Sequence, residues 1–411
     1  MKNFMHHRFF LMIILFAGLL LNSCNQKDET IKKNYEHFNS NQYKFAITSE
    51  QAKFRLTSLQ LIFPETSVFA TKANSDIEVH KLIYKTSFKS TGILASGLVC
   101  LPKTSGNYPV LCFQNGTNTL HSKAPTENPQ DDLFSILESV ASMGFIVVIP
   151  DYIGFGSSSN LPHPYLHAES STQSILDMLR AVNEFSSDEK VVAKPTKDLF
   201  IFGYSQGGWA TMLLQKAIET NYSSEFNLIA SSCAAGPYSL EYMNEYIAGQ
   251  TDYPMPYFLA YLLNAYRTIG LLSKPLSDFI QEPYASKIPG LFDGEHSGGS
   301  INSSLTTKMA DFLTPEYRTG YSTNSNFTDL KSAFQANSAT AWPVSTPTRL
   351  YHGSLDNYIP ESLSQKMLMD FRTLGVSDSK LQLVIIPGAS HESAILTVGL
   401  HTILWFLELK K

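Results

Sequence analysis

Short apolar runs alternate along this chain with segments in which apolar residues recur every three or four positions. The short runs have the length and continuous hydrophobicity of strands buried on both faces, and they cover 110–113, 145–149, 199–202, 228–232, 348–351 and 381–386. The segments of helical spacing cover 131–141, 168–186, 209–218, 363–374 and 394–409. This alternation predicts an α/β fold in which a mostly parallel central sheet is flanked by helices.

Two regions depart from the alternation. Residues 77–84 and 93–101 show the period of two that is typical of antiparallel strands. Between 238 and 340 there is no clean strand pattern, and the segment is rich in aromatic residues at helical spacing. We therefore expect a core formed by 51–237 and 341–411, with a helical cap or lid inserted at 238–340.

The N-terminus has the features of a targeting segment. A partly basic start precedes the apolar run Phe9 to Leu21, whose length suits the core of a signal peptide rather than a membrane span. The run ends in Leu21-Asn22-Ser23-Cys24, which resembles a lipobox with Cys24 as the lipidated residue; ordinary secretory cleavage near Ser23 is the alternative. We expect a signal peptide at 1–24, a tether at 25–50 and an exported outer-membrane lipoprotein. The polar residues after Cys24 resemble a surface-export signal, or simply form a solvated linker.

Charge and cysteine content narrow the class of protein. The formal net charge of −5 is spread without a basic stripe, so nucleic acid is not an expected partner. With Cys24 lipidated, Cys100, Cys112 and Cys233 remain, and we expect them as buried free thiols, with a Cys100–Cys112 bridge as the alternative. No Cys/His spacing resembles a zinc site, and neither a metal nor an organic cofactor is implied.

The segment Gly203-Tyr204-Ser205-Gln206-Gly207 carries the pattern G-x-S-x-G. An apolar strand leads into it and a helical pattern leads out, which is the context in which a sharp turn lifts a serine hydroxyl above a sheet edge. The flanking glycines are required because a side chain there would collide with neighbouring backbone. The sequence therefore predicts Ser205 as a nucleophile.

A serine hydroxyl needs a base, and that base needs an orienting acid. Asp356 follows the strand at 348–351, and His391 follows the strand at 381–386, so both lie where the order serine, acid, histidine requires them. We expect Asp356 as the acid and His391 as the general base. His352 precedes the acid, and we expect it to pack at the strand end.

An oxyanion needs hydrogen-bond donors. The backbone N–H of Gln206, directly after the nucleophile, is one expected donor. The second is expected from the loop after 110–113, where Gly116 allows a close turn that aims the N–H of Thr117 at the site; a plain glycine turn is the alternative.

With these residues placed, the chain resembles the secretory lipase family of the α/β-hydrolase superfamily, of the fungal lipase A type and its bacterial relatives. The resemblance rests on 150–157, 203–208, the stretch from His352 through Asp356 to Pro360, and Gly388 to His391. It implies an esterase or lipase that cleaves a small-molecule, lipid or polysaccharide ester through an acyl-enzyme. A serine peptidase on the same fold and a non-catalytic surface binding lipoprotein remain the alternatives.

Overall fold

A computed structural model describes residues 34–410 of the chain. Contacts divide it into two units, Met1–Tyr35 and Glu36–Lys411, and the second unit contains all the elements described below. The predicted signal peptide, Cys24 and the first part of the predicted tether lie outside the described residues.

One sheet of nine strands runs through the second unit in the order β1-β2-β3-β5-β4-β6-β7-β8-β9. The first three strands and the β3–β5 pair are antiparallel, and every pairing from β5 to β9 is parallel. The bounds are β1 (Phe38–Ile47), β2 (Ile77–Phe88), β3 (Thr91–Pro102), β4 (Gly106–Gln114), β5 (Ile146–Pro150), β6 (Ala193–Tyr204), β7 (Asn227–Ala234), β8 (Thr348–Gly353) and β9 (Leu381–Ile386). The mostly parallel sheet predicted from the alternating pattern is confirmed.

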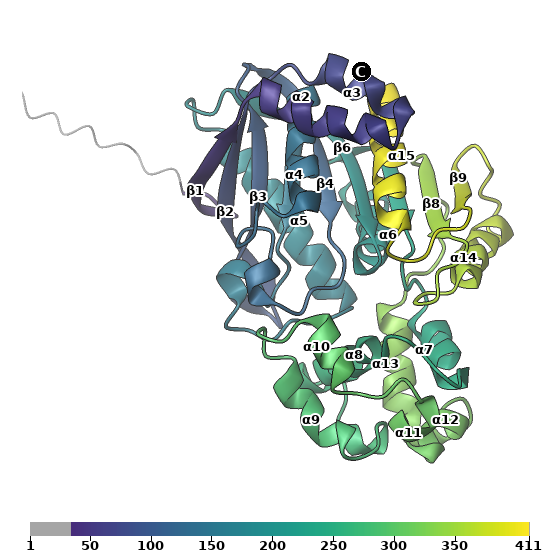
Figure 1. Cartoon of the computed structure of the whole chain (residues 1–411). Helices are drawn as coiled ribbons and strands as arrows, with labels where there is room; N and C mark the ends of the chain where they lie inside the picture. The colour runs from purple at the N-terminus through teal and green to yellow at the C-terminus, as the bar shows by residue number, and fades with distance from the viewer. Residues whose placement is uncertain (1–33, 411) are drawn as a thin grey trace, which may run out of the picture. The chain divides into compact units, whose positions relative to one another are not determined.

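Helices cover both faces of the sheet, and each face has its own apolar core (Figure 1). One core joins the sheet to α2 (Ser49–Ser58), α3 (Ser67–Lys72), α4 (Asp132–Val140) and α15 (Ala394–Leu409). The other core joins it to α5 (Ala168–Phe185), α6 (Gln206–Ala217) and α14 (Glu361–Thr373). The parallel strands are therefore buried on both sides, which explains their unbroken apolar character.

Between β7 and β8 the chain forms a group of helices that lies beyond one end of the strands (Figure 1). They are α7 (Leu240–Gly249), α8 (Pro256–Thr268), α9 (Tyr284–Leu291), α10 (Gly298–Ser303), α11 (Met309–Phe312), α12 (Pro315–Gly320) and α13 (Thr328–Asn337). Buried aromatic rings hold them together; Phe279 and Tyr317, for example, meet edge to face with ring centroids 5.3 Å apart. These rings belong to the same apolar cluster that covers one face of the sheet, so the aromatic surplus of the segment is largely core.

The two ends of this helical insertion meet. The backbone N–H of Ala339 donates to the carbonyl of Tyr238 at 2.7 Å, and the N–H of Leu240 donates to the Ser338 hydroxyl at 2.9 Å. The indole N–H of Trp209, on α6, donates to the carbonyl of Asn337 at 2.9 Å. The insertion therefore leaves and re-enters the core at one place.

The prediction of a tether over 25–50 is wrong for the second half of that range, which contains β1. Strand β1 pairs antiparallel with β2, and the carboxylate of Glu184 accepts the backbone N–H of His37 at 2.9 Å and that of Phe38 at 2.6 Å. Thr48 then caps α2 in a reciprocal capping box with Gln51. An edge strand has one partner and a solvated side, so its sequence is polar enough to be mistaken for a linker.

The three cysteines of the described region are buried and free, as expected, and no Cys100–Cys112 bridge forms. None of the helices within 34–410 combines the length and hydrophobicity needed to cross a lipid bilayer.

Glu138, on α4, is an acidic side chain enclosed in the apolar core between α2 and α4. Its side chain is fully buried, neither carboxyl oxygen has a hydrogen-bond partner among the described residues, and the nearest cation, Arg55 Nη1, is 3.8 Å away. Burial raises the pKa of Glu138 to about 8, and the Arg55 charge offsets only part of that rise. The folded protein therefore retains this proton at neutral pH.

Replacing Glu138 with glutamine should flatten the pH dependence of stability. The unfolded carboxyl loses its proton near the ordinary glutamate pKa of 4.5, and the folded one loses it near 8. The raised folded-state pKa stabilises the fold below 4.5, and this contribution is lost as pH rises to 8, by roughly 1.4 kcal/mol per pH unit at most. Urea unfolding at pH 5 and pH 8 should show Glu138→Gln gaining stability relative to the wild type as pH rises. The exposed Glu50→Gln is the control; parallel pH dependences for Glu138→Gln and the wild type would contradict the assignment.

Candidate active site

Ser205 lies at the turn between β6 and α6 in a backbone conformation that few residues other than glycine adopt. Its φ is 60° and its ψ is −123°. The backbone N–H of Ser205 donates to the carbonyl of Ala234 on β7 at 2.9 Å, which ties the turn to the neighbouring strand. The G-x-S-x-G segment thus forms the strained strand-to-helix turn that its sequence context predicts.

The glycines around Ser205 are required by close backbone contacts. A Cβ atom on Gly207 would lie 1.9 Å from the carbonyl oxygen of Gln114, at the end of β4. One on Gly208 would lie 2.2 Å from the carbonyl oxygen of Ala234, at the end of β7. Both obstacles are main-chain atoms, which cannot rotate away. The first turn of α6 is therefore wedged between the carboxyl ends of two strands.

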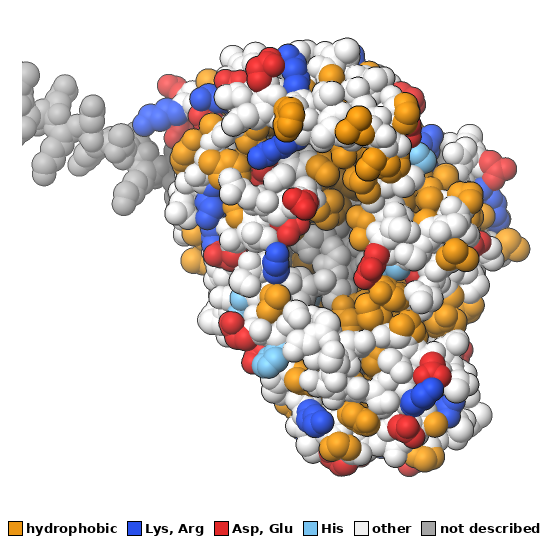
Figure 2. Space-filling model, viewed as in Figure 1, with side chains coloured by type: hydrophobic (Ala, Val, Ile, Leu, Met, Phe, Trp, Pro, Cys, Tyr) orange, Lys and Arg blue, Asp and Glu red, His pale blue; other side chains and the backbone are white. Residues whose placement is uncertain are grey.

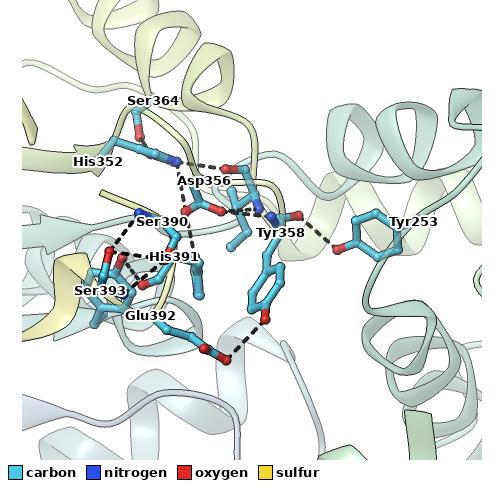
Figure 3. Close-up of polar contacts among 11 residues, drawn as sticks. Tyr253, His352, Asp356, Tyr358, Ser364, Ser390, His391, Glu392 and Ser393 are labelled. Atoms are coloured by element: carbon cyan, nitrogen blue, oxygen red, sulfur yellow. Dashed lines mark hydrogen bonds and ion pairs between the residues drawn. The ribbon is translucent and has the colours of Figure 1, made fainter. Parts of the chain in front are cut away.

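Asp356 and His391 are brought together by two loops that hydrogen-bond to each other. The loops follow β8 and β9, which are adjacent and parallel. The backbone N–H of Leu355 donates to the carbonyl of Ala389 at 2.9 Å, and the N–H of Gly388 donates to the Ser354 hydroxyl at 2.8 Å. As a result, Nδ1 of His391 lies 2.6 Å from Oδ2 of Asp356 (Figure 3).

The Asp356 carboxylate is fully buried and surrounded by donors. Its Oδ1 accepts the backbone N–H groups of Tyr358 and Ile359, both at 2.9 Å, and its Oδ2 lies between His391 and His352 (Figure 3). Burial by itself would raise the pKa of Asp356, but the hydrogen bonds from His352 and His391 and the nearby backbone N–H groups hold that pKa well below its usual range. The group therefore stays ionised and orients the imidazole of His391.

His352 is a site residue that the sequence analysis underrated. It does lie at the strand end, but its Nε2 is 3.3 Å from Asp356 Oδ2 and 2.8 Å from the carbonyl oxygen of Ile359. Both neighbours of Nε2 are acceptors, so Nε2 carries a proton. Nδ1 lies 2.7 Å from the Ser364 hydroxyl, which donates to it when the ring is neutral. His352 thus closes the inner side of the carboxylate, on the side opposite His391.

Ser205 and His391 line the same cavity, which has a volume of about 330 Å³. The backbone at Gly116 and Thr117 forms another wall, close enough that a Cβ on Gly116 would be 3.9 Å from Cβ of Ser205. No hydrogen bond joins the Ser205 hydroxyl to His391 among residues 34–410. In the space-filling view, the surface is hollowed between the sheet-bearing part and the helical insertion, with hydrophobic side chains along its lower edge (Figure 2).

The two predicted oxyanion donors come from two different segments next to Ser205, the start of α6 and the loop after β4. Gln206 is the first residue of α6, so its backbone N–H has no partner within the helix. Thr117 lines the cavity, and its side-chain hydroxyl is hydrogen-bonded to the Tyr165 hydroxyl at 2.8 Å. Asn115, just before this turn, donates from its side chain to the carbonyl of Pro150 at 3.0 Å.

His163 is a buried histidine that contacts the side chain of Gln206, directly after Ser205. The sequence analysis did not single it out. Its Nδ1 lies 2.7 Å from the carbonyl oxygen of Ile153, and its Nε2 is 3.0 Å from Nε2 of the Gln206 side chain. Burial lowers the pKa of His163 to about 4. The ring is therefore neutral, donates to Ile153 from Nδ1 and accepts from Gln206. No pattern in the sequence indicates this contact, because the motif 150–157 contains Ile153 but does not extend to His163.

Within residues 34–410 no group of three or more His, Cys, Asp or Glu side chains is arranged to hold a metal ion. Cys24, the predicted lipidation site, lies in the part of the chain that is not described.

The model of the secretory lipase family matches residues 119–408, which is more than half of the chain and includes Ser205, Asp356 and His391. The chain belongs to the secretory lipase family. A search of curated proteins finds no match. The resemblance inferred from the sequence motifs is thus confirmed, and family membership supports hydrolysis of carboxylic esters.

Solved structures similar to this chain share its fold. A candidate hydrolase from Legionella pneumophila is 23% identical with a TM-score of 0.79, and the match covers 91% of this chain and 98% of the other. A ligand-bound form of the rice cell wall degrading esterase LipA from Xanthomonas oryzae is 24% identical with a TM-score of 0.75, covering 90% and 97%. Candida antarctica lipase A in its closed state is 15% identical with a TM-score of 0.63, covering 81% and 77%.

The close packing at the Ser205 turn can be tested without an activity assay. In Gly208→Ala the new methyl group meets the Ala234 carbonyl, and we expect a loss of roughly 2 kcal/mol or more of unfolding free energy. In Gly399→Ala, on α15, the new Cβ has no atom within 4 Å, so this helix position should gain up to about 1 kcal/mol. Thermal and urea unfolding measure both; equal effects of the two substitutions would contradict the packing argument.

Proposed function

We propose that this protein is an exported serine esterase that cleaves carboxylic esters through a covalent acyl-enzyme. One observation carries the proposal: Ser205, on its strained turn, faces the same cavity as His391, and that histidine is held by a buried, ionised Asp356. A binding protein would have no need of this arrangement.

In the proposed reaction Ser205 Oγ attacks the ester carbonyl while Nε2 of His391 takes the hydroxyl proton. The tetrahedral intermediate then collapses, the bond to the alcohol oxygen breaks, and His391 returns the proton to that oxygen. Water repeats the sequence on the acyl-enzyme, gives the carboxylic acid and restores the Ser205 hydroxyl. Asp356 stabilises the imidazolium in both halves. The contact between Asp356 and Nδ1 of His391 leaves Nε2 for this proton transfer.

The negative oxygen of each tetrahedral intermediate needs two donors, and we assign the backbone N–H groups of Gln206 and Thr117. The neutral His163 holds the Gln206 side chain, which keeps the start of α6 in place. His352 has a positioning role, because its N–H fixes Oδ2 of Asp356 from the inner side.

Location and substrate class complete the proposal. The family is a secretory one, and together with the apolar run at 9–21 and the lipobox-like segment ending at Cys24 this supports export as an outer-membrane lipoprotein. The similarity to an esterase described as degrading rice cell wall favours small esters, including those of polysaccharide, as substrates. The helical insertion is proposed as the cap over the site.

Replacing Ser205 with alanine should abolish ester hydrolysis. Without its nucleophile the protein should lose at least about a thousandfold in kcat/KM on nitrophenyl esters, and a fluorophosphonate probe should label the wild type but not the variant. Loss of both signals with unchanged thermal unfolding supports the mechanism. Labelling without ester turnover would favour a peptidase, to be tested with amide substrates. Absence of both turnover and labelling in the wild type would favour a binding role.

Asp356→Asn should retain the fold and lose activity. The amide cannot carry the negative charge that fixes the His391 tautomer, so we expect kcat to fall by roughly four orders of magnitude. Asp370→Asn, at a partly exposed aspartate on α14 that pairs with Lys366, is the matched control and should behave like the wild type. A similar loss in both variants, or in neither, would argue against Asp356 as the orienting acid.

A further inference from the structure

A second, narrower pocket meets Ser205 from the side of the helical insertion. Helix α7 supplies Leu240, Met243, Asn244 and Ile247, which share one helix face, and Phe258 of α8 lies across from them. The pocket is almost wholly apolar. Ser205 therefore lies where an open cavity and an apolar pocket meet. An ester whose carbonyl carbon is beside Ser205 would place its acyl group on one side of the serine and its alcohol group on the other.

Asn244 does not fit this apolar lining. Its side chain is 2% exposed, and its amide nitrogen has no hydrogen-bond partner among the described residues. Of the buried side-chain atoms without a partner in 34–410, this nitrogen is the one that belongs to a residue lining the pocket.

The other half of the amide is held firmly. The hydroxyl of Tyr317, on α12, donates to Oδ1 of Asn244. Tyr317 is fully buried and packed edge to face against Phe279 and Phe327, with ring centroids 5.3 and 5.2 Å away. Since Oδ1 is committed to Tyr317, the NH₂ group is the part of the amide left without a partner.

An unpaired, buried amide N–H group beside an apolar pocket is costly, and such groups in folded proteins usually have a partner. A bound water is a poor solution here, because a buried water needs two to four polar partners. Among the other lining residues, Ser205 is proposed as the nucleophile, and the Tyr165 hydroxyl already bonds to Thr117. A hydrogen-bond acceptor on the substrate is a better partner for the NH₂ group of Asn244 than a water molecule.

We propose that this pocket takes an acyl group bearing an oxygen at the end remote from the ester, and that Asn244 Nδ2 donates a hydrogen bond to that oxygen. This inference rests on the proposed esterase function and specifies its substrate. The oxygen can be carried by an aromatic acyl group, of the para-oxygenated phenylpropenoyl type, or by an aliphatic chain. In both cases it accepts the same hydrogen bond from Asn244 Nδ2.

The test compares esters that differ in this one atom. In the aromatic pair, methyl para-methoxycinnamate is compared with methyl para-ethylcinnamate; in the aliphatic pair, nitrophenyl ω-methoxypentanoate is compared with nitrophenyl heptanoate. In each pair a CH₂ group replaces the oxygen without changing length. An apolar pocket without a donor favours the CH₂ ester. We expect the wild type to favour the oxygen-bearing ester in at least one pair, by about tenfold in kcat/KM.

Asn244→Leu removes the donor at similar volume and should invert that preference, because the pocket is then apolar throughout. Asn264→Leu, on the same insertion but lining a different cavity, should keep the wild-type ratio. Tyr317→Phe keeps the amide, releases its orientation and should give an intermediate ratio.

The outcomes separate the two proposals. If the wild type prefers the CH₂ ester in both pairs, or if the preference for oxygen survives in Asn244→Leu, this inference is overturned while the esterase function stands. If the wild type hydrolyses none of the four esters and the fluorophosphonate probe leaves Ser205 unlabelled, both proposals fail. The wild-type ratios decide the question even if Asn244→Leu does not fold.

Discussion

The close approach of α6 to the backbones of β4 and β7 is the constraint on which the site depends. With Gly207 against the carbonyl of Gln114 and Gly208 against that of Ala234, the helix begins nearer to the sheet than any side chain would allow. The residue before the helix must then take the conformation with φ of 60°. Packing against the neighbouring strands holds Ser205 in this unfavourable backbone conformation. The Ser205 hydroxyl therefore has a fixed position.

A second feature of the site is that the carboxylate of Asp356 is buried but surrounded by hydrogen-bond donors of the protein. Two backbone N–H groups and two imidazoles occupy the positions that water would otherwise fill around Asp356. A buried charge with this many donors costs little to keep and cannot easily take a proton. The loops that provide the donors are themselves hydrogen-bonded to each other through Leu355 and Ala389, so the charge and the imidazole it faces are held by one connected set of hydrogen bonds.

The parts of this molecule that were predictable from sequence are those governed by local pattern and chain order. Buried parallel strands are recognisable in the sequence as apolar runs. Asp356 and His391 each follow such a run, so the two residues could be expected to meet at the carboxyl ends of adjacent strands. Strand β1 could not, because a polar edge strand resembles a linker. The position of His352 beside Asp356 depends on how the chain turns through 353–359, and the contacts of His163 and Asn244 depend on packing between distant segments; neither leaves a pattern in the sequence.

The meeting of the two ends of the insertion at Tyr238 and Ala339 has a consequence for how such a protein changes over time. For a loop whose ends are already joined, added or lost length costs only a slowly growing entropy. Segments within 240–337 can therefore lengthen, shorten or be replaced while the strands on either side keep their register. The stretch of chain that supplies most of the apolar pocket is in this way free to diverge separately from the stretches that carry Ser205, Asp356 and His391.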